Sequence, residues 1–213
     1  MKVETHLYLI RHGQSQGNAE RRFGGHWDTK LSDFGRLQAE VTGQYLARKS
    51  IKVVYSSDLS RAFDTAKPLA DILKLKIETS NALRERNVGI FQGLTFEEAE
   101  SRFPKEYAAL SSRDFDYVLP EGESRRETLA RASRKLNEII EFHKGENVAV
   151  FSHTGTIGML ILHLLGALQS DAAHRVWVLT RNCGIAHFEF DKDSVVRVHT
   201  VNDVSHLRNL AQG

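Results

Sequence analysis

In the stretch His6-Leu7-Tyr8-Leu9-Ile10-Arg11-His12-Gly13, a short apolar run that could form a buried strand ends on residues that could hold a phosphoryl group. Two further runs have the same form: Val53-Val54-Tyr55 precedes Ser56-Ser57-Asp58-Leu59-Ser60-Arg61, and Val148-Ala149-Val150-Phe151-Ser152 precedes His153-Thr154-Gly155. In an open parallel sheet, ligands bind outside the carboxyl ends of the strands. If these runs are neighbouring parallel strands, two arginines and two histidines meet in one pocket. A phosphate-handling enzyme is therefore the leading hypothesis.

Short β-rich runs alternate with longer helical runs along the chain, which is typical of βαβ units around a mostly parallel sheet. The pattern predicts strands at 6–10, 52–56, 75–78, 147–152, 184–190 and 195–201, and helices from Ser32 onward and at about 58–73, 123–143 and 157–168. In the first of these helices, Phe34, Leu37, Val41 and Tyr45 recur at spacings of three and four, which predicts one buried face. The turn at 191–194 predicts a closing hairpin, so at least one strand is antiparallel.

The composition changes between Thr95 and about Asp116, where charges are frequent and Pro104 separates two short helical segments. We interpret this part as a lid, at about 95–120, on a single domain that spans residues 1–213. Arg102, Lys105 and Arg113 are hypothesised to select the non-reacting end of a substrate.

The bulk composition indicates an ordinary globular protein, with 29 basic and 27 acidic residues and a formal net charge of +2. This near-balance favours neither a nucleic acid nor a membrane as a partner. The single cysteine, Cys183, cannot form an internal disulfide, and the chain starts without an apolar signal segment, so we expect a cytoplasmic location. No common metal motif is present, and the histidines show no ligand spacing: His6, His143, His163, His174 and His187. We therefore expect metal-independent catalysis with no cofactor.

The residues at the strand ends permit phosphoryl transfer. A neutral imidazole at His12 is a competent nucleophile toward phosphorus. The guanidinium groups of Arg11 and Arg61 match phosphate oxygens with paired donors. His153 is a further donor if it stays protonated beside the phosphate. The leaving alkoxide needs an acid, and Glu85 is the carboxyl group best placed for this role by sequence position.

Several segments form an ordered set: Arg11-His12-Gly13-Gln14-Ser15 with Asn18, Phe23 to Ser32, Gly35 to Ala39, Ser56 to Ala62, Leu83-Arg84-Glu85, Phe91-Gln92-Gly93, Glu121 to Ser124 and Ser152 to Gly155. This set resembles the histidine phosphatase superfamily over nearly the whole chain. The resemblance implies the phosphoglycerate mutase-like fold: a three-layer α/β/α arrangement with a six-stranded, mostly parallel sheet.

The resemblance also implies roles for individual residues. His12 is the phosphorylated nucleophile, Arg11, Arg61 and His153 form the phosphate pocket, and Glu85 is the proton donor. Four further residues are implied to lie at or near the substrate: Gln14, Asn18, Gly25 and Thr154.

Three functions remain open. The superfamily divides into phosphatases and cofactor-dependent mutases, and the mutases carry a longer insertion with an adjacent arginine pair. Between Glu85 and Glu121 this chain has only the isolated Arg86, Arg102 and Arg113, which favours hydrolysis of a small phosphate ester through a phosphohistidine. The Glu85-Arg86 pair is somewhat mutase-like, so a phosphoglycerate mutase with a bisphosphoglycerate primer is the alternative. A catalytically silent phospho-ligand binding module is the weaker alternative.

We interpret Trp27 and Trp177 as packing residues. The physiological substrate and the oligomeric state stay open.

Overall fold

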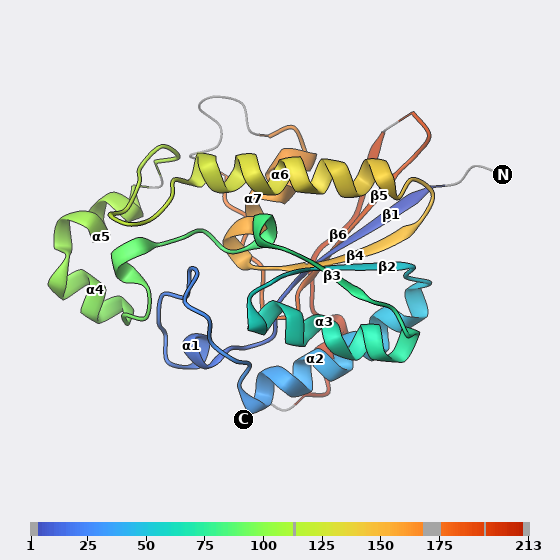
Figure 1. Cartoon of the computed structure of the whole chain (residues 1–213), viewed down its shortest axis with the longest axis horizontal. Helices are drawn as coiled ribbons and strands as arrows, with labels where there is room; N and C mark the ends of the chain where they lie inside the picture. The colour runs from blue at the N-terminus through green and yellow to red at the C-terminus, as the bar shows by residue number, and fades with distance from the viewer. Residues whose placement is uncertain (1–3, 113, 168–175, 194, 211–213) are drawn as a thin grey trace.

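The computed structural model describes residues 4–112, 114–167, 176–193 and 195–210, and one mixed sheet of six strands lies at its centre (Figure 1). The strands are β1 (Thr5–Arg11), β2 (Val53–Ser57), β3 (Ile77–Ser80), β4 (Asn147–Ser152), β5 (Ile185–Phe190) and β6 (Val196–Asp203). Their order across the sheet is β3-β2-β4-β1-β5-β6. Only β5 runs opposite to the others, because it pairs antiparallel with both β1 and β6. The predicted six-stranded, mostly parallel sheet is confirmed.

Helices cover both faces of the sheet. The α-helices of the described residues are α1 (Gln16–Ala19), α2 (Asp33–Leu46), α3 (Ser60–Leu73), α4 (Phe96–Arg102), α5 (Pro104–Ser111), α6 (Arg125–Phe142) and α7 (Thr154–Leu164). Figure 1 shows α6 and α7 on one side and α2 and α3 on the other, with α4 and α5 set apart beyond one end of the sheet. Alternate residues of β1 serve the two cores: Leu7 and Leu9 pack toward α6 and α7, whereas Tyr8 and Ile10 pack toward α2 and α3. The three-layer prediction is confirmed.

The three strands that were expected to be neighbours are neighbours. Arg11 of β1 is opposite Ser152 of β4, and Ser56 of β2 is opposite Phe151. Their carboxyl ends therefore lie at the same edge of the sheet, and the residues that follow them meet there.

The buried face of α2 differs from the predicted one. Leu37 is 55% exposed. The residues that are buried are mostly small: Gly35, Gln38, Ala39, Thr42, Gly43 and Leu46. A Cβ on Gly43 would lie 2.8 Å from the backbone nitrogen of Leu69 in α3, so the two helices approach closely. Close packing selects the face with small residues, and the spacing of large apolar residues does not detect it.

Other boundaries differ by small amounts. β3 begins at Ile77 rather than Leu75, and the loop after β1 contains the short helix α1. Ser32 is the N-cap of α2, as predicted, and its hydroxyl accepts a hydrogen bond from the backbone N–H of Gly35 at 3.0 Å. Leu168, at the end of the predicted apolar helix, lies outside the described residues, as do Arg113 and His174.

Candidate functional site

A cavity of about 370 Å³ opens at the carboxyl ends of the parallel strands. Seven of the nine predicted site residues line it: Arg11, His12, Asn18, Arg61, Glu85, Gly25 and Thr154. They come from β1, α1, α3, α7 and the loops between these elements. The structure thus brings together groups that are up to 143 positions apart in the sequence.

The side chain of His12 is held in one orientation just beyond β1. It is 4% exposed, and its Nδ1 lies 2.7 Å from the carbonyl oxygen of Gly13, which can only accept. The proton therefore lies on Nδ1, and the lone pair of Nε2 is left free. Burial lowers the pKa of His12 well below its ordinary value, and the charges of Arg61 and Arg11 lower it further. A neutral imidazole with a free Nε2 is the form that a nucleophile needs.

The hydrogen bonds of the two arginines go to backbone carbonyl groups, and the carboxylate of Asp28 lies 4.0 Å from Nη1 of Arg61. Arg61 lies in the first turn of α3, where it donates to the carbonyl oxygens of Trp27 at 3.0 Å and Gly25 at 2.8 Å. Arg11 donates to the carbonyl oxygen of Thr180 at 2.6 Å, and its buried Nε has no hydrogen-bond partner. Neutral anchors leave the positive charge available to an anion. Arg11 and Arg61 both line the cavity, so their placement suits the predicted binding of a phosphate.

Glu85 lies at the N-terminus of α7. Its carboxylate accepts backbone N–H groups of Gly155 at 3.0 Å, Thr156 at 3.2 Å and Arg86 at 2.9 Å. Helix N-termini favour negative charge, and these bonds fix the position of the carboxyl group. A Cβ on Gly155 would lie 2.5 Å from Oε1 of Glu85, so a side chain at this position would displace the carboxyl group.

His153 lies next to His12 but is wholly buried, with ring centroids 5.1 Å apart. Its Nε2 lies 2.9 Å from the hydroxyl oxygen of Ser57, and its Nδ1 has no partner. Burial and the charge of Arg61 lower its pKa well below the ordinary value. His153 is therefore neutral near pH 7, in contrast to the protonated form considered from the sequence.

Asn182 is a residue that sequence reasoning missed. Its Nδ2 donates to the carbonyl oxygen of His12 and to Oδ1 of Asn18, both at 3.1 Å. Asn18 also closes a capping box with Ser15 at the start of α1. Asn182 precedes β5 and is more than 160 positions away from both partners. No local motif points to it, so only the fold reveals this link.

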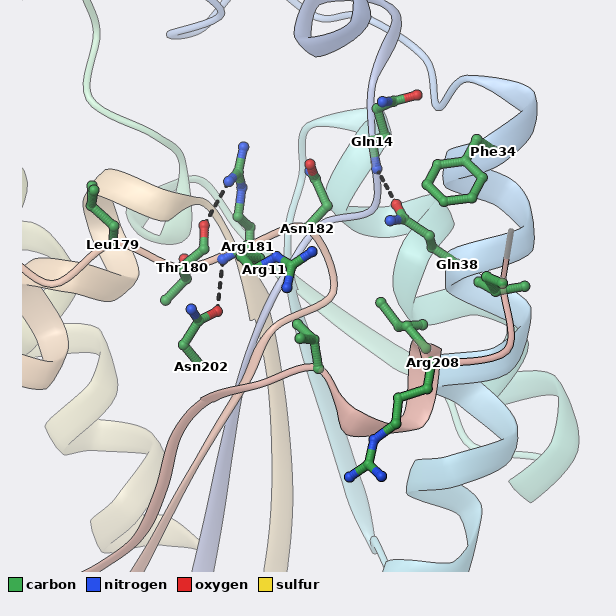
Figure 2. A pocket seen from close by; sticks show the side chains of 13 residues that line it. Arg11, Gln14, Phe34, Gln38, Leu179, Thr180, Arg181, Asn182, Asn202 and Arg208 are labelled. Carbon is green, nitrogen blue, oxygen red and sulfur yellow. Dashed lines mark hydrogen bonds between the residues drawn. The ribbon is translucent and has the colours of Figure 1, made fainter. Parts of the chain in front are cut away.

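Gln14 lies apart from the other predicted site residues. It lines a neighbouring cavity of about 790 Å³, and Figure 2 shows its backbone N–H bonded to Oε1 of Gln38. Its own Oε1 accepts from the hydroxyl of Ser32 at 2.7 Å. Arg11 borders both cavities. Gln14 thus supports the loop after β1 and is not among the residues that line the cavity containing His12.

The segment at about 95–120, predicted from the sequence to be a lid, contributes apolar side chains to the cavity rather than the charges that were hypothesised. Phe96 of α4 and Leu110 of α5 line it, whereas Arg102 and Lys105 do not, and Arg113 lies outside the described residues. Trp177, interpreted from the sequence as a packing residue, also lines the cavity.

Arg86 is a buried arginine of the cavity with an unpartnered donor atom. Among the described lining residues are five arginines, at positions 11, 22, 61, 86 and 125, and one carboxylate, Glu85. Arg22 bonds to Glu20 and Glu98, and Arg125 bonds to two carbonyl oxygens. Arg86 is only 7% exposed, and its Nη1 has no hydrogen-bond partner. Glu85 and Glu123 stabilise the charge of this guanidinium, but a buried N–H group on Nη1 without an acceptor is costly unless a ligand supplies one.

Some histidines with no ligand spacing in the sequence come together in space. Nδ1 of His6 lies 3.0 Å from Nε2 of His187, and His199 lies beside them. Spacing along the sequence does not reveal this contact, because neighbouring antiparallel strands bring distant positions together. This group lies at the start of β1, away from the cavity.

Comparison with known proteins identifies the family. The sequence model of the histidine phosphatase superfamily (branch 1) matches residues 7–204. Phosphoglycerate mutase-like protein 4 of Arabidopsis thaliana is 41% identical over 157 residues, which cover 72% of this chain and 68% of that protein. The metal-independent phosphoserine phosphatase of the same plant is 33% identical over 217 residues, with 99% and 87% covered. Three mycobacterial relatives are 36% identical over 204 residues, and the match spans only 55% of their length.

A solved structure agrees with the sequence matches. The mycobacterial glucosyl-3-phosphoglycerate phosphatase Rv2419c, solved with VO3, superimposes with a TM-score of 0.81 at 29% identity and covers 92% of this chain and 98% of that one. The chain belongs to the histidine phosphatase superfamily. In the part of the chain that the structure describes, no helix has the length and apolar character to cross a bilayer.

Proposed function

We propose that this protein is a metal-independent phosphomonoester hydrolase that acts on a small phosphorylated metabolite through a phosphohistidine at His12. The observation that carries the proposal is the state of His12: a neutral imidazole, fixed through Nδ1, between two arginines and in one cavity with Glu85. This is the set of groups that stepwise phosphoryl transfer requires.

In the first step, the lone pair on Nε2 of His12 attacks phosphorus. The bond from phosphorus to the ester oxygen breaks, and that oxygen takes its proton from the carboxyl group of Glu85. Arg11 and Arg61 hold the phosphoryl oxygens as charge moves onto them, and such preorganised charge is usually the largest contribution to the rate. If the hydroxyl of Ser57 donates a hydrogen bond to Nε2 of His153, the proton of this imidazole lies on Nδ1. That N–H group would be a further donor to the phosphate.

In the second step, the ionised Glu85 removes a proton from water, which attacks the phosphorus. The bond from phosphorus to nitrogen breaks, its electron pair returns to Nε2, and inorganic phosphate leaves. Asn18 and Thr154, which line the cavity, would help to orient the phosphate, as would the backbone at Gly25.

Rapid quenching of the enzyme with a ³²P-labelled phosphomonoester tests this mechanism. We expect an acid-labile phosphoprotein in the wild type and none in His12→Asn, with circular dichroism showing that the variant is folded. Label that persists in the variant would exclude His12 as the nucleophile. Saturable binding of the ester without label or turnover would instead support the silent binding module.

Mutase activity is the second candidate, favoured by Arg86 next to Glu85 and by the mutase-like relative. A mutase would require a bisphosphorylated primer and would keep the phosphate on its product. Hydrolysis predicts free inorganic phosphate without a primer. Assaying phosphate release with and without bisphosphoglycerate separates the two reactions.

The unpartnered Nη1 of Arg86 supports a narrower substrate class: phosphomonoesters with a second anionic group, such as a carboxylate. Arg11 and Arg61 balance a phosphate dianion, and Arg22 is paired with the carboxylates of Glu20 and Glu98. Nη1 and Nη2 of Arg125 are occupied by backbone carbonyl oxygens, whereas Nη1 of Arg86 has no acceptor in the protein. A carboxylate near the ester bond would supply the acceptor that Nη1 of Arg86 lacks.

Two substrates that differ only by a carboxylate test this class: O-phosphoserine and O-phosphoethanolamine. For Arg86→Gln we expect kcat/KM to fall about 10–100-fold with phosphoserine, which corresponds to the loss of one charged hydrogen bond. With phosphoethanolamine we expect less than about a threefold change, since no bond is lost. Equal losses with both substrates would show that Arg86 acts on the phosphoryl group instead.

A further inference from the structure

A second histidine group occupies the opposite end of β1 from the cavity. His6 of β1, His187 of β5 and His199 of β6 come from three adjacent strands, and one ligand atom from each lies within 4.8 Å of the others. His12 follows His6 by six positions, a distance of about 20 Å along an extended strand. The group therefore takes no part in the reaction at His12.

The three imidazoles lie on the same face of the sheet. His6 and Tyr8 alternate with the core residues Leu7 and Leu9, so they share the face that packs toward α2. His187 pairs with Tyr8 across the strands, and its ring stacks on that of Tyr8 with centroids 4.3 Å apart. This stacking limits the movement of the central imidazole.

The spacing of the nitrogens suits one metal ion. Nδ1 of His6 and Nε2 of His187 lie 3.0 Å apart. A tetrahedral Zn²⁺ ion holds each nitrogen at about 2.0–2.1 Å, which places two ligand nitrogens about 3.3–3.4 Å apart. A shift of a few tenths of an ångström would admit the ion between these two rings.

His199 can provide the third ligand. Its side chain is 42% exposed and stacks on His187 with ring centroids 4.4 Å apart, and one of its nitrogens lies within 4.8 Å of the other two ligand atoms. Oε2 of Glu189 lies 2.8 Å from Nε2 of His199, and Oε1 of Glu189 accepts from Arg197 at 2.5 Å. Such a carboxylate behind a ligating histidine orients the ring and raises its basicity.

We propose that His6, His187 and His199 form a binding site for one late first-row divalent cation, with Zn²⁺ as the expected ion. Three imidazoles are ligands that Zn²⁺, Cu²⁺ and Ni²⁺ accept well, and the exposed side leaves the fourth position to water. A bound ion links β1 to β5 and to the edge strand β6, so it stabilises that edge of the sheet.

Isothermal titration of ZnCl₂ into tag-free, chelator-treated protein tests the site. We expect one saturable site in the wild type and at least about tenfold weaker binding in His6→Gln and in His199→Gln, as each removes a ligand. Glu189→Gln keeps the shape but removes the carboxylate, and we expect it to weaken binding by about tenfold. The matched control is His163→Gln, because His163 lies on α7 and its Nε2 lies 3.2 Å from Oδ1 of Asn137, away from the histidine group. The affinity of this variant for Zn²⁺ should be unchanged.

Thermal unfolding gives a second readout. At a Zn²⁺ concentration one hundred times Kd, the wild-type Tm should rise by about 5–10 °C, and the His6→Gln/His199→Gln double variant should show no rise. Absence of saturable binding, or equal affinity in the wild type and both single variants, would overturn the proposal. Neither result depends on phosphatase activity, so the proposed function is tested separately.

Discussion

The two ends of β1 carry two histidine groups that share a residue type and a strand but differ in their surroundings. His12 and His153, at the carboxyl end, are buried beside Arg11 and Arg61. His6, at the other end, faces His187 on the partly exposed face of the sheet. The arginines make the first group a place for an anion. In the second group the nearest partners are other imidazoles and a carboxylate, which favours a cation. The chemistry of a histidine thus depends on what surrounds it.

Exchanging one histidine at each end should give the largest effect on activity and test the comparison directly. We expect His12→Asn to lower kcat by at least about 10³-fold, because removing a nucleophile leaves only the residual effect of the binding groups. His6→Asn should change kcat/KM by less than about twofold, since it lies about 20 Å away. Steady-state phosphate release measures both. A large loss in His6→Asn with an intact fold would show that the two ends are coupled.

The position of Glu85 offers a smaller perturbation of the anion-binding end. Gly155→Ala places a Cβ 2.5 Å from Oε1 of Glu85, so the carboxyl group must move. A misplacement of about 1 Å can lower the rate about 100-fold, and we expect a loss of this size in kcat with a folded protein.

A double-mutant cycle with Glu85→Gln shows whether this effect acts through Glu85. If it does, adding Gly155→Ala to Glu85→Gln lowers kcat little further. Additive losses would instead mean that the new methyl group obstructs the substrate itself.

The smallest expected effect is the pH dependence of stability, which depends on His187 beside His6 at the amino end of β1. The pKa of His187 is lowered to about 4, whereas an unfolded histidine titrates near 6.5. The unfolded chain therefore binds more protons between pH 6.5 and 4, so the free energy of unfolding falls as the pH falls through this window. His187→Gln should lose less stability than the wild type between pH 7 and pH 5 in urea unfolding.

His12 and His153 act in the same direction in this measurement, because burial also lowers their pKa values. The wild type and His187→Gln share both residues, so the difference between the two proteins isolates His187. Equal losses of stability in both proteins would contradict the lowered pKa of His187.

Much of the candidate site could be predicted because its residues follow strand ends. Arg11, His12 and His153 come directly after apolar runs, and parallel strands bring such positions to one edge. Arg61 was also predictable, as it opens the helix after β2. Arg86 and Asn182 were not assigned roles, since their significance lies in a missing partner and in a long-range hydrogen bond.

Hydrophobic spacing and turn residues act over a few positions, so the sequence alone indicates the succession of strands and helices along the chain and the residue types at the strand ends. It does not indicate the small-residue face of α2, the separation of Gln14 from the cavity that His12 lines, or the contact of His6 with His187, which the folded structure shows. These features depend on how closely two distant backbones approach and on which strands become neighbours. Both are properties of the packed chain, and a local pattern contains no information about them.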